Sequence, residues 1–380
     1  MSINPNPYVR ELEPYKISIS ADLAAHEKEK FIKLDWNEST YPPAPGVRKA
    51  LINSIEKGSI NYYPDVHAIE VKAKLSSLLG VPVSYIQVFN GSDAALRDIS
   101  MTYLGENDSV LIREPVYTQI YTFIQARGAR VVSIMGSDPF EKAIGKYIEV
   151  LDQQTIKMVY IVNPNNPTGT HYSRDEIEFL VSKYPEVLFI VDEAYTEFTQ
   201  VSVVDLTGTL PNLIVARTFS KAFGLAGIRI GYIVCDPEIL QYIDRIRNGK
   251  EVNALAQIAA ITAIDEINYM HEKVEMVQIN RTWLVRQLQE SGYEVIDTPA
   301  NFILLKVVRV NKLLEGLRER KILVRDRSYM PQLEGCVRIS IGIMAEMEKL
   351  LAALIELKPQ VLNSSSVLGH RSYSTTPKPS

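Results

Sequence analysis

Short apolar runs separated by helical patterns recur through the first two thirds of the chain. Many of these runs are continuous rather than alternating, which is typical of strands buried on both faces. An amphipathic run from Ala68 to Leu79 predicts a helix just before the first of them. The pattern therefore predicts an α/β fold with a mainly parallel sheet between helices. The predicted strands are Ile86–Phe89, Ser109–Ile112, Arg130–Ile134, Met158–Val162, Leu188–Val191, Leu213–Ala216 and Gly231–Val234.

The pattern changes after the last of these strands. A long helical pattern runs from Ala254 to Glu290 with no glycine or proline inside it, so it could leave the sheet domain and enter a second one. Beyond it, strand-like and helical runs alternate, which suits a smaller α/β domain. These runs are Phe302–Val310, Asn311–Arg320, Ile322–Arg325 and Val337–Ile341.

Both ends of the chain differ from its middle. Met1 to Pro14 is polar and proline-containing and predicts an extended arm, whereas the Ser/Thr/Pro-rich stretch beyond Pro359 predicts a disordered tail. We therefore expect four parts: an arm over residues 1–40 that joins the small domain, a large domain over 41–265, a small domain over 266–359, and a tail over 360–380.

The bulk composition excludes several classes of protein. With 380 residues, 46% hydrophobic and 23% charged, the chain has the composition of a soluble globular protein. A net charge of −4 gives no basic field for nucleic acid or for a membrane surface. No uncharged apolar stretch approaches the roughly 20 residues of a membrane helix. Cys235 and Cys336 lie in apolar runs and predict small core residues, so we expect a cytoplasmic protein without disulfides. The five histidines match no zinc spacing, and no metal is expected.

The candidate chemistry centres on Lys221. This lysine follows the apolar run Leu213–Ala216, with the hydroxyl of Ser220 one residue before it and the guanidinium of Arg229 eight residues after it. A lysine amine can form a Schiff base with a carbonyl compound. Serine and arginine side chains bind phosphate. The arrangement therefore suggests a Schiff-base lysine beside a phosphate site.

Further polar side chains follow neighbouring predicted strands, where open parallel sheets bind their ligands. Asp192 ends an apolar run, so its charge needs a partner, and Tyr195 follows three residues later. The alternative for Asp192 is a carboxylate that caps a helix. Asn166 lies in the turn-rich loop Asn163–Gly169, which is either a functional loop or simply a turn.

Three more residues occupy similar positions. Ser92 and Asp93 precede a helix-like stretch whose exposed N–H groups could bind phosphate, although an ordinary helix cap is the alternative. Tyr117 could stack on a flat ligand ring. With 20 tyrosines in the chain, simple packing is the alternative for any one of them.

Together these pieces resemble fold-type I pyridoxal-phosphate enzymes, the class I and II aminotransferases, and in particular the histidinol-phosphate aminotransferase family. The resemblance spans roughly Leu12 to Gly342. The dipeptides Pro14-Tyr15 and Tyr63-Pro64 point to the narrower family. The most specific stretches are Asn163–Gly169, Asp192–Tyr195, Thr218–Arg229, Val324–Asp326 and Cys336–Ser340.

The resemblance implies a role for each of these residues. Lys221 would be the Schiff-base lysine and proton shuttle, and Asp192 would pair with the pyridine nitrogen of pyridoxal 5'-phosphate. Tyr195 and Asn166 would hold the phenolic oxygen, with Asn166 also near the substrate. Tyr117 would stack on the cofactor ring. The cofactor phosphate would be bound by Ser92, Asp93, Ser220 and Arg229.

The resemblance also implies substrate contacts and a homodimer with its sites at the interface. Arg338 would bind the α-carboxylate of the amino donor. Tyr15, Arg325 and Tyr63 would lie near a distal phosphate, and Tyr63 would reach the substrate and cofactor from the partner subunit.

The expected activity is amino transfer between glutamate, or a similar donor, and a carbonyl substrate that carries a phosphate. Histidine biosynthesis is one candidate pathway. Two departures leave the acceptor open: Ala94 stands where the family commonly has an acidic residue, and Asn37–Pro42 differs from the family's Asn-Glu-Asn-Pro-Tyr. Other pathways therefore remain open. So do a decarboxylase of phosphorylated amino acids and a non-enzymatic binding module on an inherited fold.

Overall fold

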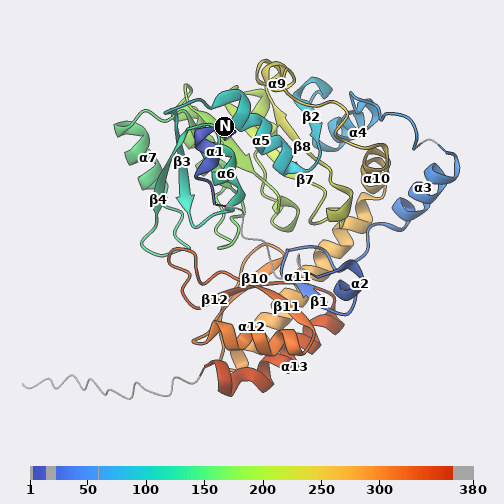
Figure 1. The fold of residues 1–380 in the computed structure, drawn as a ribbon, viewed down its shortest axis with the longest axis vertical. Helices are drawn as coiled ribbons and strands as arrows, with labels where there is room; N and C mark the ends of the chain where they lie inside the picture. Colours follow the sequence, from blue (N-terminus) through green and yellow to red (C-terminus); the bar gives the residue numbers. More distant parts are fainter. Residues whose placement is uncertain (1–2, 14–22, 59, 363–380) are drawn as a thin grey trace, which may run out of the picture.

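The computed structural model describes residues 3–13, 23–58 and 60–362. Figure 1 shows two tiers, each built around one sheet. The upper tier holds a seven-stranded sheet and the lower tier a five-stranded one. The large sheet has the order β2 (Ile86–Phe89), β8 (Gly231–Cys235), β7 (Leu213–Thr218), β6 (Leu188–Asp192), β5 (Met158–Val162), β3 (Ser109–Glu114) and β4 (Arg130–Met135).

The large sheet confirms the prediction of a mainly parallel sheet. β3 to β7 pair in parallel with one another, and only β8 runs against its neighbours β7 and β2. β2 therefore points the same way as the central strands, and the carboxyl ends of β2, β3, β5, β6 and β7 meet at one edge. All seven predicted strands are present, and several extend one or two residues further than expected, so that Asp192 closes β6 and Thr218 closes β7.

Helices cover this sheet, with α5 packed on β2, β7 and β8, and α4 packed on β2. The predicted helix at Ala68 is α4, which begins one residue later. Helices of the large tier are α3 (Pro45–Glu56), α4 (Ile69–Leu79), α5 (Ser92–Tyr103), α6 (Gln119–Gln125), α7 (Ile144–Gln153), α8 (Arg174–Lys183), α9 (Pro237–Ile243) and α10 (Ala254–Asp265). Short 3-10 turns are η2 (Val83–Tyr85), η3 (Thr196–Phe198), η4 (Val204–Gly208) and η5 (Ala226–Ile228).

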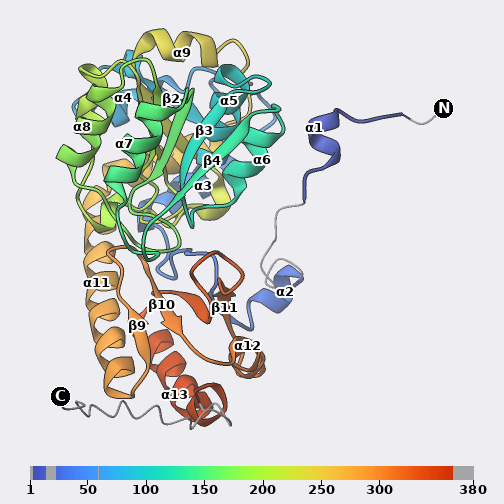
Figure 2. The same ribbon diagram turned by 90° about the vertical axis from the view of Figure 1, so that its left-hand side faces the viewer.

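The long helix expected from Ala254 to Glu290 is interrupted at one residue, so the expectation of an unbroken pattern is wrong there. α10 ends at Asp265, and α11 (Ile267–Glu290) begins after Glu266. The carboxylate of Glu266 accepts a hydrogen bond from the backbone N–H of Gly46 at 3.0 Å, which ties the break to the start of α3. Figure 2 shows α11 running alongside the lower sheet, as expected for a helix that links the two tiers.

The small sheet draws on both ends of the chain. Its order is β1 (Ile32–Leu34), β11 (Ile322–Asp326), β12 (Cys336–Ser340), β10 (Phe302–Lys306) and β9 (Glu294–Ile296). β1 pairs in parallel with β11, so the N-terminal segment belongs to this sheet. α12 (Val310–Glu319) packs on β11 and on α13 (Met344–Val361), and α11 packs on β9 and β10.

Three expectations about this part of the chain need correction. The strand predicted to end at Val310 ends at Lys306, because Val310 begins α12. The stretch Met1–Pro14, predicted to be extended, contains one short helix, α1 (Pro7–Arg10), and a second, α2 (Ala25–Lys28), precedes β1. α13 continues through Pro359 to Val361, so the boundary predicted at residue 359 falls inside a helix. The predicted tail lies mostly outside the described residues, and the division into four parts stays a prediction.

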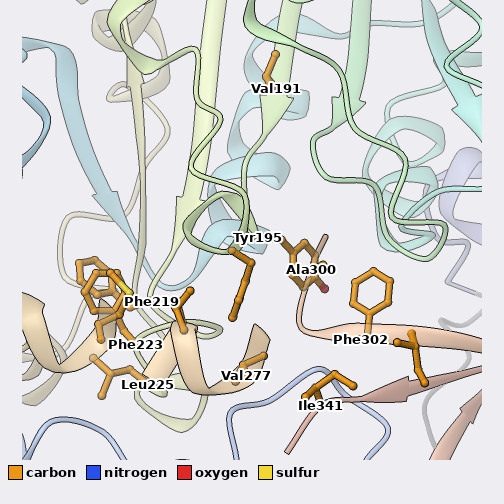
Figure 3. Close-up of a cluster of buried hydrophobic side chains, with 14 of the residues drawn as sticks. Val191, Tyr195, Phe219, Phe223, Leu225, Val277, Ala300, Phe302 and Ile341 are labelled. Atoms are coloured by element: carbon orange, nitrogen blue, oxygen red, sulfur yellow. The ribbon is translucent and has the colours of Figure 1, made fainter. Parts of the chain in front are cut away.

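The two tiers share one hydrophobic core beneath the carboxyl edge of the large sheet. A single cluster of buried side chains includes Val191 and Phe219 of the large tier and Phe302 and Ile341 of the small one; Figure 3 shows them together. The ring of Tyr195 meets that of Phe302 edge-on, with 5.5 Å between centroids. This packing fixes side chains of both tiers relative to one another.

Within the described ranges, no helix has the length and apolar character needed to cross a membrane. The same residues contain no cluster of three or more histidine, cysteine or carboxylate side chains suited to a metal ion. Cys235 and Cys336 are buried free thiols, as expected for small core residues.

Candidate active site

A cavity of about 500 Å³ lies between the two tiers at the carboxyl edge of the large sheet. It brings together all the predicted site residues except Tyr15 and Tyr63. From the large tier it is lined by Ser92, Asp93, Tyr117, Asn166, Asp192, Tyr195, Ser220, Lys221 and Arg229. From the small tier and its N-terminal segment it is lined by Asp35, Trp36, Glu38, Arg325, Arg327 and Arg338.

Lys221 projects from the loop after β7. Phe219 anchors this loop, because its ring is fully buried and its backbone N–H donates to the carbonyl of Ile230 at 3.1 Å. The Lys221 amine donates to the carbonyl oxygen of Trp36 at 2.9 Å. Burial, with help from the positive charge of Arg338, lowers the pKa of Lys221 to about 8. Roughly a tenth of the amine is therefore neutral and nucleophilic at pH 7.

Asp192 presents a buried carboxylate to the same cavity from the end of β6. One oxygen accepts the hydroxyl proton of Tyr160 at 2.8 Å, and the other accepts the backbone N–H of Ala194 at 3.1 Å. Burial outweighs these bonds and raises the pKa of Asp192 to about 6. A carboxylate that is costly to ionise in isolation stabilises a cationic partner strongly.

Tyr195 and Asn166 are joined to the small tier by hydrogen bonds. The amide nitrogen of Asn166 donates to the Tyr195 hydroxyl oxygen at 3.2 Å, and its amide oxygen accepts from Arg338 at 2.6 Å. Arg338 also donates to the carbonyl of Asp35 at 2.7 Å. Burial raises the pKa of Tyr195, so its phenol keeps its proton as a hydrogen-bond donor at neutral pH.

An anion cradle forms where α5 begins. The Arg229 side chain reaches this helix start. One of its nitrogens lies 3.4 Å from the Ser220 hydroxyl, and another lies 3.7 Å from the Asp93 carboxylate. The Asp93 carboxylate also accepts a hydrogen bond from the Tyr117 hydroxyl at 2.8 Å. Gly91 precedes the helix with φ +79°, and a Cβ there would lie 2.5 Å from an Arg229 nitrogen. A side chain at position 91 would strain the backbone and push the Arg229 guanidinium away from the helix start, where backbone N–H groups can bind an anion.

The opposite wall carries three guanidinium groups. Arg325 on β11 and Arg338 on β12 are register partners, and both are buried. Arg327 lies two residues beyond Arg325 and is also buried against the cavity. Planar guanidiniums bind carboxylate and phosphate in bidentate fashion, so this wall suits anionic substrates.

Two predicted residues are not in this group. Tyr63 is 78% exposed and does not line the cavity, and the Lys250 amine lies 4.7 Å from its ring centre. Tyr15 lies outside the described residues.

The sequence reasoning missed Asp35, Trp36 and Arg327, and it noted Asn37 and Glu38 only as part of a departure from the family's pattern. β1 is only three residues long, which is too short for a pattern to predict, yet it delivers the segment from Asp35 to Glu38 to the cavity. The available signal was the polar Asn37–Glu38 pair directly after Ile32–Trp36, where apolar and charged residues alternate. For Arg327 the signal was its spacing of two from Arg325, which places both side chains on one face of an extended chain.

Comparison with known proteins agrees with this geometry. Residues 29–354 match the family described as aminotransferase class I and II. The chain is 35% identical to a dihydroxyacetone phosphate transaminase of Campylobacter jejuni, over 90% of this chain and 94% of the relative. It is 34% identical to a histidinol-phosphate aminotransferase of Geotalea daltonii, over 86% of this chain and 92% of the relative.

A solved structure has the same architecture. The histidinol-phosphate aminotransferase of Sinorhizobium meliloti, in complex with pyridoxal-5'-phosphate, is 26% identical with a TM-score of 0.86 and covers 95% of this chain and 99% of its own. The chain therefore belongs to the class I and II aminotransferases, as the motifs around Lys221 predicted, and is a pyridoxal-phosphate-dependent enzyme.

Proposed function

We propose that this enzyme moves an amino group between glutamate, or a similar amino acid, and a carbonyl compound that carries a phosphate. The observation that carries the proposal is the wall of Arg325, Arg327 and Arg338, which faces Lys221 across one cavity. One arginine suffices for an α-carboxylate, so the others leave room for a second anion. The names of both sequence relatives contain a phosphorylated compound, which supports the same substrate class.

The residues present fit pyridoxal phosphate. Asp192 is a buried carboxylate suited to a protonated pyridine nitrogen. Arg229 lies close to Gly91, so its guanidinium and the backbone N–H groups at the start of α5 form a cradle for a phosphate. When bound, the cofactor supplies an electron-accepting ring for the bond broken at the substrate carbon.

The chain's own residues would then divide the work. Lys221 would hold the cofactor covalently, and its freed amine would take a proton from the substrate carbon and return it one position away, which its lowered pKa favours. Tyr195 and Asn166 would hold the cofactor's phenolic oxygen, and Tyr117 would cover its ring. Ser92, Asp93, Ser220 and Arg229 would hold its phosphate.

The substrate would be oriented from the small tier. Arg338 would bind the α-carboxylate of the donor, and Arg325 would bind the distal phosphate of the acceptor. Because Arg338 is also bound to Asn166, a carboxylate at this position would be fixed relative to the cofactor site. Such positioning lowers the entropic part of the barrier.

We also propose a homodimer, in which Tyr63 reaches the partner's site. Ile60, Tyr62 and Tyr63 are more than half exposed, and Ile52 and Ile55 on nearby α3 are about half exposed. Figure 1 places α3 at the margin of the large tier. Apolar side chains gathered on a surface in this way favour a protein contact. The predicted cytoplasmic location is supported by the two free thiols, as expected in a reducing compartment.

The decisive experiment is a half-reaction screen. The enzyme is first loaded with glutamate, which converts the cofactor to its aminated form, and the cofactor spectrum is then followed as carbonyl compounds are added. Imidazole-acetol phosphate and dihydroxyacetone phosphate are each compared with their unphosphorylated counterparts. We expect the phosphorylated members to restore the starting spectrum at least tenfold faster per unit concentration, as the loss of one charge-assisted contact implies.

The same screen separates the alternatives. Restoration by unphosphorylated compounds alone would remove the role given to Arg325. A separate incubation of the enzyme with phosphorylated amino acids and no keto acid tests for a decarboxylase, which would release carbon dioxide. Preference between the two phosphorylated carbonyl compounds would decide whether histidine biosynthesis is the pathway.

A further inference from the structure

Asn37 is a fully buried residue that the small tier holds in place. It follows β1, which pairs with β11, and its backbone has a positive φ of 54° that asparagine tolerates better than most residues. Its backbone N–H donates to the Ser340 hydroxyl at 2.9 Å, and its carbonyl accepts from the amide of Asn301 at 3.0 Å. The residue is thus fixed from two directions.

Ser340 also bonds to the oxygen end of the Asn37 side-chain amide. The Ser340 oxygen already accepts the backbone N–H of Asn37, so its own proton is available for the Asn37 side-chain oxygen, 3.2 Å away. The other end of the amide, its NH₂ group, then faces the large tier. There it donates to the Tyr195 hydroxyl oxygen at 3.0 Å.

The Tyr195 oxygen therefore accepts two N–H donors. The second comes from Asn166, whose amide cannot be reversed, because Arg338 can only donate to the amide oxygen. With both amides donating to the phenol oxygen, the hydroxyl proton of Tyr195 must point elsewhere. The side chain is 3% exposed and lines the cavity, so the cavity is the remaining direction.

We propose that Asn37 is a positioning residue for Tyr195: its amide donates to the phenol oxygen, turns the hydroxyl proton into the cavity, and strengthens it as a donor to the cofactor's phenolic oxygen. Hydrogen bonds in a chain polarise one another. An N–H group that donates to the Tyr195 oxygen therefore makes the Tyr195 hydroxyl proton a stronger donor to the next acceptor. The inference rests on the proposed role of Tyr195. It assigns the N-terminal segment a part in tuning the cofactor, because the contact crosses from one tier to the other.

The test is a pH titration of the visible absorbance of the cofactor-loaded protein without substrate. This band follows the protonation of the nitrogen that joins the cofactor to Lys221. A strong donor on the phenolic oxygen stabilises its negative charge and holds the titration midpoint low. Asn37→Gly removes the amide but suits the positive φ, so its backbone is not strained. We expect its midpoint to rise by roughly half a pH unit, the size of one neutral hydrogen bond.

A double-mutant cycle shows whether the effect passes through Tyr195. In a Tyr195→Phe background the phenol oxygen is absent, so Asn37→Gly should cause no further shift. The same shift in both backgrounds would mean that Asn37 acts on general packing, and the proposal would be overturned. An unmoved midpoint in the folded single variant would overturn it too.

Ser340→Ala provides a second test of the role of Asn37 if Asn37→Gly does not fold. Ser340→Ala leaves Asn37 in place but removes the hydroxyl that orients its amide, so we expect a smaller shift in the same direction, again absent in the Tyr195→Phe background. No shift with Ser340→Ala would count against the proposal. A loaded wild-type protein that lacks this visible band would contradict the covalent role of Lys221, and so both this inference and the proposed function.

Discussion

Tyr160 donates its hydroxyl proton to the carboxylate of Asp192 over 2.8 Å, from the neighbouring strand of the large sheet. Both side chains are buried, and the bond opposes the effect of burial on the pKa of Asp192. Without it, the carboxyl group would be still harder to ionise. Tyr160 therefore keeps Asp192 available as an anion for a protonated pyridine nitrogen.

Tyr160→Phe should weaken cofactor binding. The pKa of Asp192 rises when the bond is lost, and a hydrogen bond to a charged group is worth about 1.5–3 kcal/mol, so we expect the cofactor dissociation constant to increase about tenfold or more. Equilibrium dialysis of the apoprotein at pH 7.5 measures this. Tyr147→Phe is the matched control, because Tyr147 is equally buried but interacts with Tyr172 and Arg113 instead of Asp192. Equal weakening by both variants would show a general packing effect.

The lowered pKa of Lys221 predicts how its reaction with the cofactor aldehyde depends on pH. Only the neutral amine reacts, so the capture rate should rise about tenfold per pH unit and level off near pH 8. Arg338→Leu removes a positive charge that contributes to this shift, so its midpoint should lie at higher pH. Stopped-flow absorbance after mixing apoprotein with pyridoxal phosphate gives the midpoint.

Lys72 serves as the control lysine for this prediction. Burial lowers the pKa of Lys72 as well, but Lys72 does not line the cavity. Borohydride reduction of the loaded enzyme, followed by peptide mass analysis, should therefore find the cofactor on Lys221 and not on Lys72. Labelling of Lys72, or a midpoint near the ordinary lysine value, would contradict the assignment.

The large sheet and the residues at its edge were predictable because buried parallel strands are continuous apolar runs that end in polar residues. Asp192 and Lys221 could be placed from such runs alone, since strand direction brings strand ends to one edge. The break at Glu266 was not predictable, because glutamate is a good helix former and only its contact with Gly46 reveals why the helix is interrupted.

Asn37 and Arg327 carry only a weak signal in the sequence. Asn37 meets Tyr195 across 158 positions in the chain, and its role depends on a three-residue strand whose pairing is decided by tertiary packing. Arg327 is one of many charged residues in the printed sequence. Only the fold shows that it is buried and turned towards the cavity.

Arg338 and Arg325 should act on opposite halves of the reaction. Lysine keeps the charge but loses the bidentate fork, so Arg338→Lys should lower kcat/KM for the amino donor roughly 10–100-fold, whereas Arg325→Lys should lower it for the phosphorylated acceptor. Each half-reaction is measured separately by the cofactor spectrum. The informative quantity is the ratio of donor to acceptor kcat/KM, which should shift in opposite directions in the two variants. A shift in the same direction would mean that the two arginines bind one anion together.

Glu197 predicts a pH dependence of stability that lies outside the catalytic groups. It belongs to η3, and its Oε2 atom has neither solvent contact nor a hydrogen-bond partner among the described residues. Burial raises its pKa from an ordinary 4.5 to about 7. Because the folded state holds the proton more tightly than the unfolded state, the protonated group contributes stability below pH 4.5, and that contribution is lost as the pH rises through 7.

Glu197→Gln should therefore be more stable than the wild type at pH 8.5 by about 2 kcal/mol, with the difference shrinking towards pH 5. Urea unfolding of the two cofactor-loaded proteins at each pH measures the difference in their free energy of unfolding. Because Asp192 is present in both proteins, its own pH-dependent contribution drops out of this difference. Glu178→Gln is the control, because the Glu178 side chain is 43% exposed and its ion pair with Arg174 is worth little at any pH. Parallel pH curves for wild type and Glu197→Gln would show that Glu197 is ionised in the folded protein throughout this range.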